Sequence, residues 1–288
     1  AMGYGAGASV TTGLRNNFVG GFTGDAITTG TDNTAIGHAA LTSDDVGSKS
    51  TAVGADALSA QNFTTATDSH NTAVGYQAGV AVTTGVQNTL IGSKAGDALT
   101  DADFNVAVGM SALGVDTLGS KSIAIGTGAL STQNFTTATD SFNVAIGHSA
   151  GNLVTTGKQN TLVGGLAADA LTTGTNNVAM GYLALSTETA GDNSVAIGRS
   201  ALGTQNVATG GNVYNTAVGH SAGGAVTTGT VNTLIGGLAG DALDVGNENT
   251  ALGYFALSTD TKGDRNVAIG NGALGTQNFT TSTDVYNV

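Results

Sequence analysis

The 288-residue chain contains no cysteine, which excludes a disulfide framework, a thiol nucleophile and a zinc–thiolate site. Lysine and arginine number only 8 against 20 aspartates and glutamates, for a net charge of −12, and they form no cluster. Nucleic-acid backbones and anionic lipids attract concentrated positive charge, so we expect neither as a partner. No apolar run approaches the roughly 20 residues of a membrane helix, so we expect no membrane insertion in this segment.

Aromatic residues are also scarce, at 5% of a chain that is 40% hydrophobic. The apolar content is therefore carried by Ala, Val, Ile and Leu, which suit a thin, regular core. What the chain has instead is a short phrase, N-[T/V]-A-[V/I]-G, that recurs from end to end, as in NTAVG at 71–75 and NTLIG at 88–92.

The last residue of each phrase, here termed the marker glycine, recurs at intervals of 17, 17, 17 and 21 residues. Four intervals make 72 residues, and four times 72 is the length of the chain. A fixed period with apolar residues in register is typical of a repeat architecture. The marker glycines are Gly3, Gly20, Gly37, Gly54, Gly75, Gly92, Gly109, Gly126, Gly147, Gly164, Gly181, Gly198, Gly219, Gly236, Gly253 and Gly270.

The residues before each marker glycine predict a short β-strand. The residue just before it is Met, Val, Ile or Leu in all 16 phrases, and two residues earlier stands a Thr, Val or Ile in nearly all of them. This alternation of β-branched residues, bounded by Asn and Gly, is typical of a strand, whereas a helix needs i, i+3, i+4 spacing. A second apolar patch and a polar turn complete each unit.

One such unit buries too little apolar surface to offset the entropy of ordering its backbone, so the units must stack. We predict an all-β, parallel β-solenoid of about 16 coils, continuous over 1–288, with four super-repeats at 1–72, 73–144, 145–216 and 217–288. Stacking turns each column of the repeat into a ladder, with side-chain amide stacking at the asparagines. The predicted ladder residues include Asn33, Asn71, Asn88, Asn105, Asn143 and Asn160, with Gly37, Gly75, Gly92 and Gly109; Ser50, Ser122 and Ser194 replace the asparagine.

The middle residue of each strand raises the question of a partner chain. We expect the first and third strand residues to face the interior and the middle one, which is Ala in 12 of 16 coils, to face outward. A strand that is apolar on both faces is usually buried on both, so we expect this flank to contact a second copy. The larger middle residues are the candidate interchain contacts: Phe18, Leu90, Leu162 and Leu234. Alternatively, exposed alanines cost little and need no partner.

Three stretches, NSVAIGRSAL at 193–202, NVAIGHSAG at 143–151 and KSIAIGTGAL at 121–130, resemble the head repeats of YadA-like trimeric autotransporter adhesins and related phage tail-fibre repeats. The resemblance covers essentially the whole chain. It implies a left-handed parallel β-roll with three chains side by side, displayed outside a cell or on a virion. The unit here is longer than that family's usual repeat, and no stalk, anchor or chaperone segment is recognisable. We expect the chain to be a window of a longer fibre, with head-to-tail stacking of subunits as the alternative.

Every fourth unit carries a four-residue extension, at 60–71, 132–143, 204–215 and 276–287. Loops carry function more often than scaffolds do, which makes Phe63, Phe135 and Phe279 candidate lateral contacts. The alternative is that each Phe folds back over its own coil as a local cap.

No catalytic, cofactor or metal-binding constellation is recognisable, and we do not expect an enzyme. The four histidines lie in unrelated settings, and Asp25, Asp97, Asp169 and Asp241 recur too far apart to share one ion. We therefore expect an extracellular structural rod, a phage tail-fibre shaft or adhesin head, that associates with itself and makes weak contacts with a cell-surface receptor or glycan. The alternatives are a self-assembling matrix or sheath filament and, on the recurring VTTG, an ice-binding solenoid.

Overall fold

The computed structural model describes residues 1–288 and contains strands and turns but no helix. The chain forms two compact units, Ala1–Phe142 and Asn143–Val288. In both, short strands alternate with turns along a parallel β-solenoid, of about 16 turns in all. The predicted all-β solenoid is confirmed.

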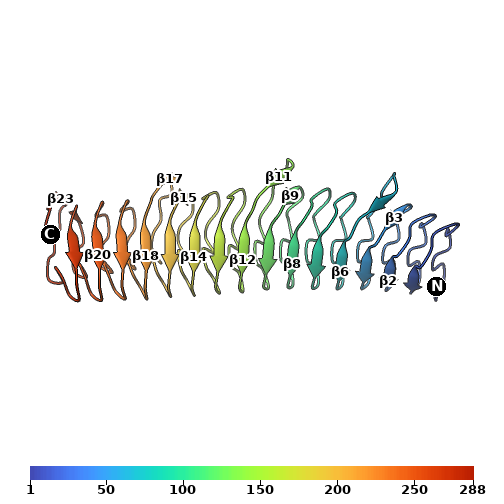
Figure 1. The fold of residues 1–288 in the computed structure, drawn as a ribbon, viewed down its shortest axis with the longest axis horizontal. Helices are drawn as coiled ribbons and strands as arrows, with labels where there is room; N and C mark the ends of the chain where they lie inside the picture. Colours follow the sequence, from blue (N-terminus) through green and yellow to red (C-terminus); the bar gives the residue numbers. More distant parts are fainter. The chain divides into compact units, whose positions relative to one another are not determined.

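In the first unit, seven three-residue strands lie side by side and pair in parallel (Figure 1). They are β1 (Asn17–Val19), β2 (Thr34–Ile36), β4 (Thr51–Val53), β6 (Thr72–Val74), β7 (Thr89–Ile91), β8 (Val106–Val108) and β10 (Ile123–Ile125). Two-residue strands pair separately, β3 (Gly47–Ser48) with β5 (Thr67–Asp68) and β9 (Gly119–Ser120) with β11 (Thr139–Asp140).

The second unit repeats this arrangement with eight strands. They are β12 (Val144–Ile146), β13 (Thr161–Val163), β14 (Val178–Met180), β16 (Val195–Ile197), β18 (Thr216–Val218), β19 (Thr233–Ile235), β20 (Thr250–Leu252) and β22 (Val267–Ile269). The short pairs are β15 (Gly191–Asp192) with β17 (Gly211–Asn212) and β21 (Gly263–Asp264) with β23 (Thr283–Asp284).

Strand pairing keeps every repeat column in register. Thr34 lies opposite Thr51, and Thr51 lies opposite Thr72, so each residue meets its own counterpart in the next turn. The four extra residues of every fourth unit do not disturb this register, because they lie in the loop on the other side of the turn.

The marker glycines end the strands in a conformation that only glycine adopts readily. Their φ angles lie between 126° and 142°, a region that side chains disfavour. Space excludes a side chain as well: a Cβ on Gly54 would lie 2.2 Å from the carbonyl oxygen of Gly75, and one on Gly92 would lie 2.7 Å from that of Gly109. The repeat therefore depends on a glycine at this corner of each turn.

The asparagines form a buried ladder inside the coils. The backbone N–H of Asn88 donates to Oδ1 of Asn71 over 2.9 Å, and Asn105 bonds to Asn88 in the same way. Each side-chain amide also donates along its own turn, as Asn88 Nδ2 does to the carbonyl of Ala102 at 2.7 Å. These side chains are fully buried and their amides are paired, so the ladder satisfies backbone groups that water cannot reach.

Serine replaces asparagine where a glutamine from the extended turn takes over its role. Ser50 still donates its N–H to Asn33 Oδ1, at 2.9 Å. Its short side chain leaves room for Gln61, which donates to Ser50 Oγ over 2.7 Å and accepts from Asn71 Nδ2 over 2.9 Å. The substitution and the loop extension are therefore one structural feature.

The predicted orientation of the strands was wrong. The middle residues face the interior, and the first and third residues face outward: in β7, Leu90 is fully buried whereas Ile91 is 39% exposed. The four proposed interchain contacts are therefore core residues, with Phe18 3% exposed and Leu90, Leu162 and Leu234 not exposed at all. A turn of 17 residues encloses a narrow interior, which explains why its inward residue is usually Ala.

The larger residue that recurs every 72 positions fits because glycine stands beside it. A Cβ on Gly79 would lie 2.6 Å from Leu90 Cδ1, and one on Gly96 would lie 2.8 Å from Leu90 Cδ2. Where the middle residue is Ala107, the residue six positions later is a buried leucine, Leu113. Neighbouring columns thus exchange large and small side chains at nearly constant interior volume, as close packing requires.

We predict that Leu90→Ala lowers the free energy of unfolding by about 2–5 kcal/mol, because the flanking glycines cannot fill the cavity that it leaves. Leu14→Ala is the matched control: Leu14 is 59% exposed, and its truncation should change stability by no more than about 0.5 kcal/mol. Urea unfolding followed by circular dichroism measures both. Equal losses in the two variants would show that Leu90 is not an interior residue.

Candidate interaction surfaces

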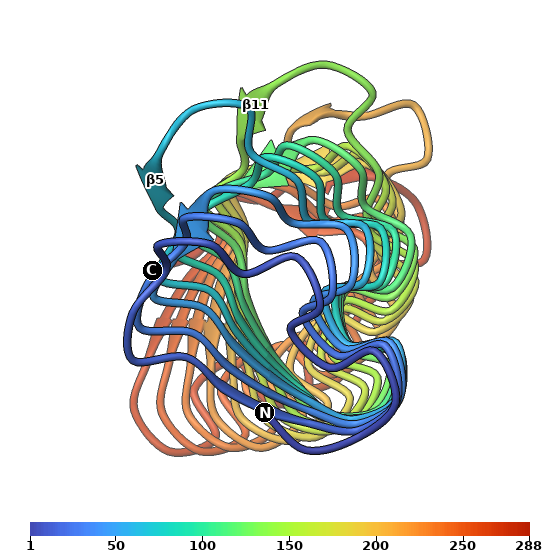
Figure 2. The ribbon, with the colours of Figure 1, turned by 90° about the vertical axis from the view of Figure 1, so that its right-hand side faces the viewer.

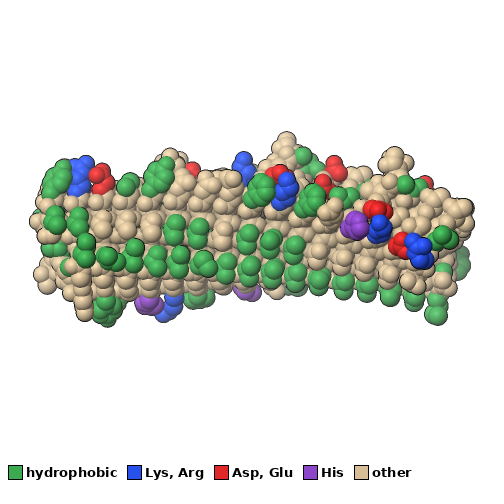
Figure 3. Space-filling model, in the orientation of Figure 1, with side chains coloured by type: hydrophobic (Ala, Val, Ile, Leu, Met, Phe, Trp, Pro, Cys, Tyr) green, Lys and Arg blue, Asp and Glu red, His purple; other side chains and the backbone are tan.

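The outward third residues of the strands form a continuous line of aliphatic side chains in each unit, here termed the aliphatic row. All of them are half-exposed or exposed. Figure 3 shows this row across the strand face. Its members are Val19, Ile36, Val53, Val74, Ile91, Val108 and Ile125 in the first unit, and Ile146, Val163, Met180, Ile197, Val218, Ile235, Leu252 and Ile269 in the second.

A second outward row runs beside the first and is formed by the first residue of each strand. It is mixed: Thr34, Thr51, Thr72 and Thr89 are followed by Val106 and Ile123, which appear in Figure 3 as an interrupted hydrophobic line. Neither row contains a charged side chain. Parallel sheets are usually covered on both faces, so this uncharged, partly aliphatic face is the surface most suited to a protein partner.

The extended loops project beyond the path of the other turns, as β5 and β11 show in Figure 2. Their phenylalanines, however, point inward. Phe63 is 5% exposed and Phe135 is 6% exposed, and the N–H of Phe135 donates to the buried Asp116 Oδ1 over 2.9 Å. The prediction that these two make lateral contacts was therefore wrong, and the local-cap alternative is correct for them. Phe279 is half-buried.

The aromatic residues that these loops do expose are others, which the sequence analysis missed. The residue just before the asparagine at the end of the loop is Phe142, 49% exposed, in the second super-repeat and Tyr214, 54% exposed, in the third. The Lys121 ammonium lies 5.3 Å from the centre of the Phe142 ring, a favourable cation–π distance. Their spacing of 72 residues was the available signal.

A buried carboxyl group anchors each extended loop. Asp44 Oδ1 accepts from the N–H groups of Gly47, at 3.1 Å, and Phe63, at 3.3 Å, while Oδ2 accepts from Gln61 Nε2 at 2.6 Å. Burial raises the pKa of Asp44, and these hydrogen bonds oppose the rise. Asp116, Glu188 and Asp260 make the same kind of contacts in the other super-repeats. Both oxygens of Asp44 are occupied, so the arrangement serves structure.

Exposed ion pairs brace the loops from outside. Lys49 lies 2.5 Å from Asp68, and Lys121 lies 2.5 Å from Asp140. In the third super-repeat an amide pair, Asn193 with Asn212, replaces the ions at 2.6 Å. Exposed pairs of this kind contribute little to stability, and their replacement by amides shows that the loop does not depend on charge.

The side chains singled out for possible chemistry remain apart. No group of three or more His, Asp or Glu residues could hold a metal ion. Among the recurring aspartates, Asp25 Oδ1 accepts from Thr42 at 2.5 Å, whereas Asp169 and Asp241 each have one oxygen without a hydrogen-bond partner. The arrangement offers surfaces for contact.

Comparison of the chain with protein-family models, curated proteins and solved structures gives no match. The structure contains no helix that is long and apolar enough to cross a lipid bilayer. The function is therefore inferred from the surfaces described above.

We predict that Asp44 makes stability depend on pH. Because its pKa is raised in the folded state, folding favours the protonated form; the stabilisation is complete below the unfolded pKa of about 3.9 and is lost as pH rises through the folded value. The free energy of unfolding of the wild type should fall more between pH 3 and pH 7 than that of Asp44→Asn. Asp45→Asn, which removes the same charge from an exposed neighbour, should behave as the wild type. An identical pH dependence in all three proteins would contradict the prediction.

Proposed function

We propose that the chain is a structural segment of an extracellular fibre, a phage tail-fibre shaft or the head of a surface adhesin, in which three copies lie side by side. The turns are left-handed in this proposal, and the fibre acts as a rigid spacer. The observation that carries it is the aliphatic row, because it leaves an uncharged sheet face open along every strand of each unit.

The proposed contact between copies differs from the one that the sequence suggested. The alanine flank lies inside the turns and cannot meet another chain. The β-branched residues of the aliphatic row, such as Ile91 and Ile146, are more than a third exposed and can. Identical faces on identical chains bury one another when the copies are arranged around a rotation axis, as closed homo-oligomers require. Removing such aliphatic groups from water supplies the driving force.

A self-assembling matrix or sheath filament is the second candidate. It is favoured by the sameness of the turns: the strand register is maintained across the super-repeats of each unit, with no recess common to all four. The two candidates differ in the particle formed, because a fibre segment gives a discrete oligomer whereas a filament grows with concentration. Ice binding is less well supported, because Val106 and Ile123 interrupt the outward threonine row.

We predict that the purified chain sediments at micromolar concentration as a trimer of three times 27.9 kDa, or 83.7 kDa. The double substitution Val74→Asp and Ile91→Asp should shift it to the monomer, because burying two carboxylates in each copy of an aliphatic interface is costly. Analytical ultracentrifugation measures the mass, and circular dichroism shows whether the strands are retained.

The matched control, Ser43→Asp with Asn62→Asp, adds the same charge at exposed positions away from the strand face and should remain trimeric. A monomeric wild type would overturn the proposed assembly. A trimer that survives the two substitutions in the aliphatic row would place the interface elsewhere.

A further inference from the structure

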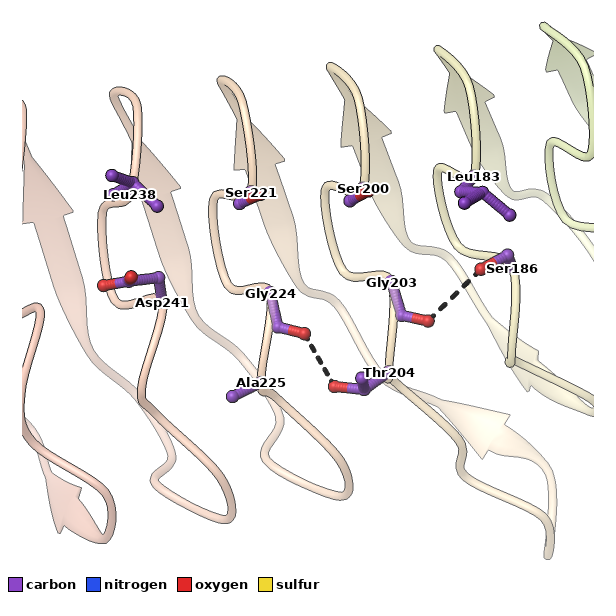
Figure 4. A pocket seen from close by; sticks show the side chains of 10 residues that line it. All are labelled: Leu183, Ser186, Ser200, Gly203, Thr204, Ser221, Gly224, Ala225, Leu238 and Asp241. Atoms are coloured by element: carbon purple, nitrogen blue, oxygen red, sulfur yellow. Dashed lines mark hydrogen bonds between the residues drawn. The ribbon is translucent and has the colours of Figure 1, made fainter.

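Four successive turns of the second unit, those that contain β14, β16, β18 and β19, enclose a surface groove of about 480 Å³ (Figure 4). One wall has Leu183 and Leu238 at its two ends, with Ser200 and Ser221 between them. The four turns cover three strand spacings, or roughly 14 Å. The groove is thus long enough for an extended ligand, and it lies within one unit. The opposite wall is formed by Ser186, Gly203, Thr204, Gly224, Ala225 and Asp241.

The groove exists because small residues occupy two columns that are filled elsewhere. The residues 144 positions earlier, in the first unit, are Ser59 and Val80 in place of Gly203 and Gly224. Asp56 and Gln77 likewise stand where the groove has Ser200 and Ser221. The recess is therefore a departure from the repeat at these turns, and not a property of the solenoid in general.

The polar groups of the groove are suited to hydroxyl groups of a ligand. The side chains of Ser200 and Ser221 have no hydrogen-bond partner in the chain. On the opposite wall, Thr204 Oγ1 donates to the carbonyl of Gly224 over 2.7 Å, and Ser186 Oγ donates to that of Gly203 over 3.3 Å (Figure 4). Each of these carbonyl oxygens has a second lone pair that can accept another hydrogen bond.

The charge of the lining restricts the class of ligand further. Asp241 is half-buried at one end, and its Oδ1 has no hydrogen-bond partner. No lysine or arginine lines the groove, and the chain carries a net charge of −12. An anionic ligand would meet only repulsion. A ligand with many hydroxyl donors and some apolar C–H surface for Leu183 and Leu238 matches the mixture of acceptors and aliphatic groups.

We propose that this groove binds a neutral oligosaccharide. Its hydroxyl groups donate to Asp241 and to the glycine carbonyls, and accept from the two free serine hydroxyls, while its C–H faces pack on the two leucines. The inference rests on the proposed function in that it supplies the lateral contact of a surface fibre. It requires only the second unit, so it is tested separately from the assembly.

The test is a titration of the full chain with neutral trisaccharides of glucose, galactose, mannose and N-acetylglucosamine, followed by isothermal calorimetry at millimolar sugar. At least one should bind. The double substitution Gly203→Ser and Gly224→Val, which introduces the first unit's residues, should weaken that binding at least tenfold. Both changes are tolerable, because a Cβ at these glycines would lie 3.2 Å from Ser200 O and 3.1 Å from Ser221 O, and neither has a positive φ.

Gly114→Ser, in the same repeat column of the first unit, is the matched control and should bind the sugar as the wild type does. Failure of every neutral trisaccharide to bind would overturn the inference, as would binding that survives Gly203→Ser with Gly224→Val. Preference for trigalacturonate over the neutral sugars would contradict the charge argument. The sedimenting mass of each variant, measured in parallel, reports on the proposed assembly, so failure of sugar binding is distinguished from failure of the fibre.

Discussion

The close stacking of each turn on the next at the marker glycine is the constraint on which the rest of the structure depends. A Cβ at these positions would lie within 2.7 Å of the carbonyl oxygen of the next marker glycine, for every marker glycine with a described neighbour. Each turn must therefore follow the backbone path of its neighbour at this corner, which sets the parallel strand register. The buried asparagine ladder enforces the same alignment on the other side of the strand, because each side chain bonds to the backbone of the next turn.

Given this alignment, the interior can vary only by exchange of volume between neighbouring columns. Leu90 is accommodated by Gly79 and Gly96, and Phe18 by Gly7 and Gly24. The polar part of the interior follows the same rule, since Gln61 occupies the space that Ser50 leaves. The 72-residue super-repeat is thus the period of a packing solution as well as of a loop.

The exterior is free of this constraint, and that is where the turns differ. The aliphatic row is kept in every strand of both units although nothing in the single chain covers it, which is why it carries the proposed association. The recess at Gly203 and Gly224 appears in one set of turns only, which is the distribution expected of a binding site rather than of a scaffold. The third super-repeat also has Glu188 and the Asn193 amide pair where others have Asp and a lysine–aspartate pair.

The repeat period, the strand positions and the parallel stacking were determined by the sequence alone, because β-branched residues, Asn and Gly recur at one spacing and only one architecture uses that spacing. The side of the strand that faces inward was not, because both faces of a three-residue strand such as Thr89–Ile91 are apolar, and the narrow interior that selects Ala appears only once the turn closes. Tertiary structure likewise decided that Phe63 and Phe135 point inward, since a carboxyl group from the preceding turn holds their backbone. It also decided the groove, whose walls combine residues from four turns that no single stretch of sequence brings together.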